Sequence, residues 1–187
     1  MKKYRHSMFR PLLVVAAACL ALAACAAPGP KKALPERIQV SWAPNDQLTE
    51  VKNNSFQRGW LKPADWQKTL SDYLRKRADL VLPPGQKLEV TFEDIKLAGD
   101  FEPWRGPDAQ DIRFMKDLYP PRATLRYRVI DAGGATIREG ESKLTDMAYL
   151  QRATLATSTD PLRYDKRLLD DWLDKEFGKR TQETTSH

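Results

Sequence analysis

Carboxylates in the middle of the chain are the first residues that could do chemistry. Six acids fall within the 24 residues from position 94 to 117. A pair of them with different pKa values could hydrolyse a glycosidic bond, and several together could hold Ca²⁺. The acids are Asp94, Asp100, Glu102, Asp108, Asp111 and Asp117. Their spacing matches no calcium-binding loop, so we expect a solubilising surface, with a carboxylate-based glycan hydrolase as the less favoured interpretation.

A second group interleaves aromatic rings with guanidinium groups in the same region. Arginine offers paired donors, and tryptophan and tyrosine give rigid contact area, so such a surface suits a protein partner or an anionic ligand. The candidate binding surface consists of Asp100, Trp104, Arg105, Arg113, Tyr119 and Arg122. The alternative is that the rings cover the edge of the core while the arginines pair with neighbouring acids.

Cysteine and histidine are nearly missing from the body of the chain. The two cysteines are Cys19 and Cys25, and the two histidines are His6 and His187. The body of the chain therefore lacks the cysteine and histidine residues that zinc sites, Ser-His-Asp triads and Cys-His nucleophiles require. We expect no catalytic residue, cofactor, metal or disulfide-linked partner, and hence a protein that is not an enzyme.

The first 24 residues have the features of an export signal. A basic start precedes the uncharged apolar run Leu12–Ala24, which is shorter than the roughly 20 residues that span a bilayer. The end of this run and the residue after it, Leu22-Ala23-Ala24-Cys25, resemble the lipobox of bacterial lipoproteins. This resemblance implies cleavage before Cys25 and lipid attachment to its sulfur. Ala26 in place of Asp implies sorting to the periplasmic face of the outer membrane.

Two other outcomes fit the same segment. Ala24-Cys25-Ala26 is also compatible with ordinary signal cleavage, which would leave a soluble periplasmic protein. The apolar run could instead stay uncut as an anchor. Residues 25–36 contain three prolines and read as a semi-extended tether.

Removing the signal changes the charge of the protein. The whole chain has 31 basic and 25 acidic residues, and four of the basic ones lie within 1–24. The remaining chain carries a net charge of only +2. Charge therefore gives no reason to expect nucleic acid as a partner.

Hydrophobic periodicity predicts the regular elements. Alternation indicates strands at 38–42, 87–97, 122–130 and 136–149, with a bulge near Glu93-Asp94 and a bulge or bend at Gly140. Spacings of three and four indicate helices at 63–81 and from about 160 to 177, the second capped by Asp160 and stopped by Gly178.

The remaining stretches give weaker signals. A short helix is expected over Asp111–Leu118, and 46–62 is expected to be a loop with Phe56 and Trp60 as packing anchors. The acids of the last helix, beginning with Asp165, are expected on its solvated face. Together the elements predict one α+β domain over 37–178, followed by a polar tail over 179–187. We expect a two-layer sandwich in which a mostly antiparallel sheet of four to five strands carries two main helices on one face.

Three segments together resemble a known family. They are LAGDFEPW at 97–104, DIRFMKDLYPPRATLRY at 111–127 and DPLRYDKRLLDDW at 160–172. Taken together, they are similar to an uncharacterised family of exported proteobacterial proteins that is described as a domain of unknown function. The similarity covers most of residues 37–178. The resemblance implies domain limits and an envelope location and brings no catalytic residues.

The sequence as a whole predicts a lipoprotein attached to the outer membrane. We expect its domain to be a non-enzymatic interaction module for another protein of the envelope. The alternative is a small-ligand or anionic-glycan binder that uses the 98–122 loop.

Overall fold

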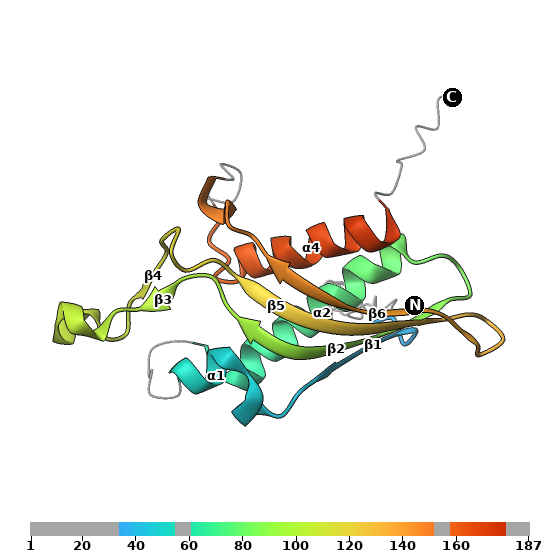
Figure 1. Cartoon of the computed structure of the whole chain (residues 1–187), viewed down its shortest axis with the longest axis horizontal. Helices are drawn as coiled ribbons and strands as arrows, with labels where there is room; N and C mark the ends of the chain where they lie inside the picture. The colour runs from blue at the N-terminus through green and yellow to red at the C-terminus, as the bar shows by residue number, and fades with distance from the viewer. Residues whose placement is uncertain (1–33, 55–60, 152–157, 179–187) are drawn as a thin grey trace, which may run out of the picture. The chain divides into compact units, whose positions relative to one another are not determined.

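The computed structural model describes residues 34–54, 61–151 and 158–178 (Figure 1). The strands are β1 (Ile38–Trp42), β2 (Lys87–Lys96), β3 (Asp100–Phe101), β4 (Arg113–Phe114), β5 (Arg122–Ile130) and β6 (Thr136–Thr145). The helices are α1 (Thr49–Asn54), α2 (Pro63–Val81) and α4 (Arg163–Phe177). Short 3-10 turns are η1 (Asn45–Gln47), η2 (Pro103–Arg105), η3 (Pro107–Ala109) and η4 (Tyr149–Gln151).

The main sheet has the strand order β1-β2-β5-β6. β1 and β2 are parallel, because the chain crosses over through α2 between them, and the other two pairings are antiparallel. β3 and β4 form a separate two-stranded ribbon. The predicted α+β class with a mostly antiparallel sheet is confirmed.

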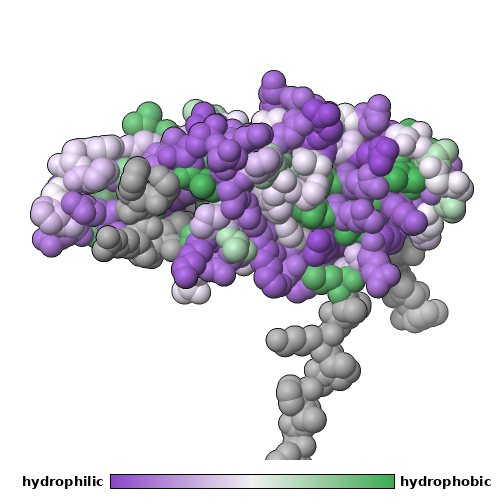
Figure 2. Space-filling model, turned by 90° about the horizontal axis from the view of Figure 1, so that it is seen from below, coloured by the Kyte–Doolittle hydropathy of each residue, from purple (hydrophilic) through white to green (hydrophobic). Residues whose placement is uncertain are grey.

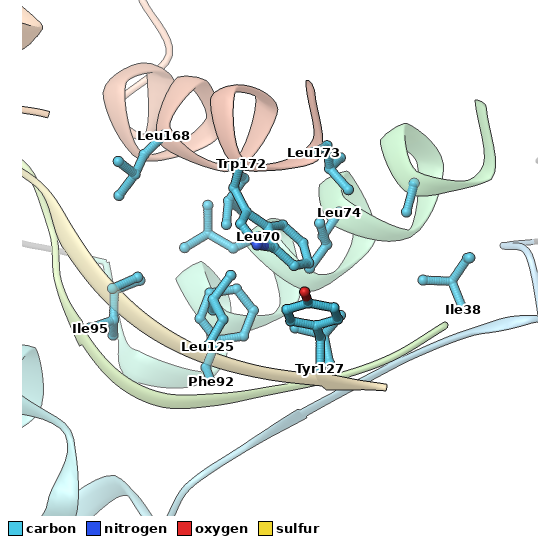
Figure 3. Close-up of a cluster of buried hydrophobic side chains, with 14 of the residues drawn as sticks. Ile38, Leu70, Leu74, Phe92, Ile95, Leu125, Tyr127, Leu168, Trp172 and Leu173 are labelled. Carbon is cyan, nitrogen blue, oxygen red and sulfur yellow. The ribbon is translucent and has the colours of Figure 1, made fainter. Parts of the chain in front are cut away.

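The core lies between one face of the main sheet and the two long helices. α2 contributes Trp66, Leu70, Leu74 and Ala78, which recur at the predicted helical spacing and are all buried. α4 contributes its own stripe around Trp172 and lies against α2 (Figure 3). The two helices thus cover the same face of the sheet, and the opposite face carries alternating charged residues.

Two local predictions about the strands have different outcomes. The bulge near Glu93-Asp94 is confirmed, because the β2–β5 register shifts between Phe92 and Asp94. The expected irregularity at Gly140 is wrong, since Gly140 pairs regularly with Tyr127. A Cβ atom at Gly140 would meet the Tyr127 ring at 3.3 Å, so the glycine makes room for that ring. The β5–β6 register shifts instead between Val129 and Ile130.

The helix expected over Asp111–Leu118 is wrong. Arg113 and Phe114 form β4, while Ile112 and Leu118 are 51% and 76% exposed and do not make an apolar stripe. The stretch 46–62 contains the short helix α1 rather than only loop. Its expected anchors Phe56 and Trp60 lie outside the described residues.

The last helix begins later than predicted, and β6 ends earlier. Asp160 caps a turn that precedes α4, because its carboxylate accepts the Leu162 amide at 2.9 Å and its carbonyl accepts the Arg163 amide at 3.2 Å. β6 ends at Thr145 instead of running to position 149. Gly178 follows α4 with φ +78°, as expected for a residue that stops a helix.

None of the helices in the described ranges has the length and apolar composition needed to cross a bilayer. On the face that Figure 2 shows, hydrophilic side chains predominate and the hydrophobic ones gather in small separate areas.

Candidate functional site

An arm formed by residues 100–119 projects from the end of the main sheet beyond β2 (Figure 1). The chain turns into it at Gly99, which has φ +78°. A Cβ atom there would lie 2.8 Å from the Phe114 carbonyl oxygen, so only glycine fits. The Gly99 amide donates to the Tyr119 carbonyl at 2.9 Å and closes the base of the arm.

Arg113 holds the arm to the body of the domain. Its side chain is only 1% exposed. The guanidinium donates to both carboxylate oxygens of Glu50 at 2.6 and 3.0 Å. It also donates to the carbonyls of Leu97, Ala98 and Gly99 at 2.9, 2.7 and 3.1 Å. A planar group with five donors is suited to this arrangement, which a lysine could not reproduce.

Lys96 and Asp100 complete the same network. The Lys96 ammonium lies 3.5 Å from Glu50 and 3.4 Å from Asp100, and donates to the Gly99 carbonyl at 3.0 Å. Glu50 also accepts the Leu97 amide at 2.9 Å. Burial alone would raise the pKa of Glu50, but the bonds and charge of Arg113 and the charge of Lys96 outweigh it and lower the pKa.

Asp165, from the first turn of α4, is a second buried carboxyl beside this network. It accepts the Ala98 amide at 3.0 Å. Burial raises the pKa of Asp165 to about 7, against the opposing effects of the Ala98 bond and the Arg113 charge. The expected solvated position of Asp165 is therefore wrong.

Glu102 is the centre of a separate cluster within the arm. Its buried carboxylate accepts from Lys116 at 2.6 and 2.8 Å, from the Tyr119 hydroxyl at 2.8 Å, and from Arg105. The Lys116 bond is the main cause that lowers the pKa of Glu102 to about 2, and Arg105 and Tyr119 add to it. Arg105 also lies over the Phe114 ring at 4.9 Å.

The predicted binding-surface residues thus divide between structural and exposed positions. Arg113, Asp100, Arg105 and Tyr119 take part in the two ion-pair clusters. Arg105 pairs with the neighbouring acid Glu102, as the alternative interpretation expected, whereas the partner of Arg113 is the distant Glu50. Arg113 is not a surface residue, because its guanidinium is needed by Glu50 and three carbonyls. The two candidates outside these clusters are exposed. Trp104 is 72% exposed on the arm, and Arg122 is exposed on β5.

The six acids of the sequence pattern do not converge on one site. Asp94 caps α1 by accepting the Thr49 amide at 2.7 Å and its hydroxyl at 2.8 Å. Asp100 and Glu102 lie in ion pairs, and the remaining three are exposed on the arm: Asp108, Asp111 and Asp117. Among the residues that the structure describes, no group of three or more His, Cys, Asp or Glu side chains could hold a metal ion.

Sequence reasoning missed three members of the buried network. Asp165 had a usable signal, because it lies three, four and seven residues before the buried Leu168, Leu169 and Trp172. Glu50 and Lys96 had none, because the ion pairs of Glu50 with Arg113 and with Lys96 join positions that are far apart in the chain.

The outer face of the sheet has an open depression between β2, β5 and β6. It is lined by Glu89, Thr91, Arg126, Tyr127, Arg128, Glu139, Gly140 and Glu141. Arg128 pairs with Glu89 of β2 and Arg126 pairs with Glu93 of β2, each at 2.6 Å. Arg138 is on the other face, where it donates to the Glu176 carbonyl at 2.7 Å.

Comparison with known proteins gives one match. A family model described as a protein of unknown function, DUF3016, matches residues 36–175. The chain belongs to the DUF3016 family. This confirms the resemblance to a domain of unknown function. No curated protein and no solved structure matches the chain. The arm, the buried Arg113 network and Asp165 all lie inside the DUF3016 match.

Proposed function

We propose that this chain is a lipoprotein held on the periplasmic face of the outer membrane through Cys25. In this proposal the DUF3016 domain is a non-enzymatic module that binds another protein of the envelope, and the arm is its contact surface. The lipobox-like segment ending at Cys25 supports the attachment. The composition and geometry of the arm support the kind of partner.

One observation carries the choice of a protein partner. The arm presents large apolar side chains to solvent, with Trp104 72% exposed and Leu118 76% exposed, while its own cations Arg105, Arg113 and Lys116 are bound to buried carboxylates. An exposed tryptophan in a rigid setting is typical of protein-binding hot spots.

The charge of the arm favours a basic partner over an anionic glycan. The acids at its surface are Asp108, Asp111 and Asp117, and the two arginines of the arm, Arg105 and Arg113, are already paired with carboxylates. We therefore propose that the partner is a protein surface with basic groups around an apolar pocket, rather than an anionic glycan.

Site-specific photocrosslinking in intact cells tests the proposal. A photoreactive phenylalanine analogue would replace Trp104 or Leu118, with Leu80 as the matched control because it is an apolar residue of α2 that is 43% exposed. We expect the same protein to be crosslinked from Trp104 and Leu118 and not from Leu80. Crosslinks to glycan, or equal crosslinking from all three positions, would contradict the proposal.

Arg113 is unsuitable as a test of binding. Its substitution would break the Glu50 pair and the carbonyl bonds, so a loss of capture would report on folding. A Trp104→Ala change leaves these contacts intact and is the substitution of choice.

A further inference from the structure

β6 is an edge strand of the main sheet, next to β5 (Figure 1). The Asp146 amide donates to the Pro121 carbonyl at 3.3 Å at the end of the β5–β6 pairing. Hydrogen-bonded positions alternate along an antiparallel pair. The backbone amides and carbonyls of the even-numbered residues of β6 therefore point toward β5. The amides and carbonyls of residues 139, 141, 143 and 145 therefore point away from the sheet, and no described residue hydrogen-bonds to them.

The outward positions have a self-complementary charge pattern. If two copies of β6 pair antiparallel about Ser142, Glu141 of each copy lies opposite Lys143 of the other. Glu139 then lies opposite Thr145. All four are outward residues, so their amides and carbonyls are in position to form a continuous ladder. We propose that this edge pairs with the same edge of a second copy of the chain in this register.

Neighbouring registers oppose like charges. Pairing about Glu141 would put Glu141 opposite itself, and pairing about Lys143 would put Lys143 opposite itself. Pairing about Gly140 would put Glu139 opposite Glu141. If one strand slid by one residue relative to the other, the outward-pointing amides and carbonyls of one copy would lie opposite residues whose backbone groups point toward β5. Pairing about Leu144 would put Lys143 opposite Thr145 and would form no ion pair. Of these registers, only pairing about Ser142 places opposite charges against each other without a like-charged pair.

The groups that the pairing needs are accessible. Lys143 has 80% of its side chain exposed, and its own contact with Glu141 on the same strand is a loose one at 3.4 Å. The irregularity opposite Ile137 lies outside the stretch 139–145, so it does not interrupt the ladder. Ser142 turns toward the helices, where its hydroxyl accepts from the Trp172 indole at 3.1 Å.

The pairing also accounts for two exposed apolar side chains. Ile137 and Met147 are 51% and 66% exposed and lie just beyond the two ends of the ladder. The two-fold about Ser142 brings the Ile137 end of one copy to the Met147 end of the other. It also keeps the helices of both copies on the same face of a continuous sheet.

Charge reversal with rescue tests the pairing. We expect sedimentation velocity of the purified full chain in nonionic detergent to show a concentration-dependent monomer–dimer equilibrium. Glu141→Lys or Lys143→Glu alone makes both cross-strand pairs like-charged, so each should weaken association at least about tenfold. The double change Glu141→Lys/Lys143→Glu should restore it, and so should mixing the two single variants in equal amounts.

The control is Lys76→Glu, a charge reversal at an exposed position of α2, which should leave association unchanged. Thermal unfolding of each variant should match the wild type, because all of the changed residues are at the surface. A wild-type chain that stays monomeric at about 100 µM would overturn the proposal. So would single reversals without effect, or a double variant and a mixture that both remain monomeric. None of these results bears on crosslinking at the arm.

Discussion

Single buried charges fix how the arm joins the domain. Glu50 is bound by Arg113 and Lys96 at one place where α1, β2 and β4 meet. Removing one member of a buried pair leaves the other charge without compensation in a medium that solvates it poorly. The network therefore specifies the position of the arm, whatever its net contribution to stability.

Glu50→Gln is predicted to destabilise the domain by about 3–5 kcal/mol, because the buried Arg113 would lose the carboxylate that accepts two of its bonds. The matched control is Glu93→Gln, which breaks a solvent-exposed pair with Arg126 and should cost at most about 1 kcal/mol. Urea unfolding of both variants measures the difference. Equal costs would show that the buried pair contributes no more than the exposed one.

Asp165 is predicted to make stability fall as pH rises. Burial raises its pKa from the ordinary 3.8 to about 7, so between these values the folded protein holds a proton that the unfolded chain releases. Its contribution is complete below the lower value and is lost as pH rises through the higher one. Asp165→Asn should remove this dependence.

Urea unfolding at about pH 5 and about pH 8 tests this prediction. The free energy of unfolding of the wild type, relative to Asp165→Asn, should decrease from the first pH to the second. A constant difference between the two proteins would contradict the shifted pKa.

Glu102 is predicted to make stability fall as pH decreases, which is the opposite of the effect of Asp165. Lys116, Arg105 and Tyr119 lower its pKa from 4.5 to about 2, so its contribution is present above pH 4.5 and is lost as pH falls toward 2. Glu102→Gln should therefore reduce the acid sensitivity of unfolding in that window. An unchanged acid transition, followed by circular dichroism, would contradict the assigned cluster.

Strands and helices with local signals were predictable, and the elements that depend on distant partners were not. The alternation of apolar and polar residues correctly predicted β1, β5 and the bulge in β2. The helical spacing of Trp66, Leu70, Leu74 and Ala78 correctly predicted α2. Their apolar faces are read from neighbouring residues alone.

The arm and α1 show why the other elements could not be predicted from the sequence. Ile112, Met115 and Leu118 have a helical spacing, but Arg113 must reach Glu50, which is 63 residues earlier, and this requires extended backbone. α1 starts at Thr49 under a cap from Asp94, which is 45 residues later. For the site, sequence reasoning named Arg105, Arg113 and Tyr119, and the expected pairing of arginines with neighbouring acids applies to Arg105 and Glu102. It could not name Glu50, whose ion-pair partners Arg113 and Lys96 are distant in the chain.

Gly99→Ala is predicted to damage the start of the arm. The residue has φ +78°, and a Cβ atom would clash with the Phe114 carbonyl at 2.8 Å, so the cost should exceed the roughly 1–2 kcal/mol of left-handed backbone alone. Gly134→Ala is the control, because Gly134 has φ +89° and no atom within 4 Å of its would-be Cβ. Equal destabilisation of the two variants in urea would show that the clash relaxes without cost.

For the molecule as a whole, the proposed lipid anchor decides where the domain can act. Cys25→Ser is predicted to release the protein from the membrane fraction to the soluble periplasm, because several acyl chains give lasting attachment and none would remain. Fractionation with immunoblotting measures this, and Cys19→Ser is the control that should change nothing. Continued membrane fractionation of Cys25→Ser would contradict the anchor.

The parallel pairing of β1 with β2 has a mechanical consequence. The strands run in register from Ile38↔Leu88 to Trp42↔Phe92, and the arm follows the far end of β2. If the chain is tethered ahead of β1 and a partner pulls on the arm, the load runs along both strands in shear. All the hydrogen bonds between β1 and β2 would then have to yield together, rather than one after another as in unzipping. In the proposed arrangement, the parallel pairing of β1 with β2 would therefore suit the domain to resisting tension between the membrane and a bound protein.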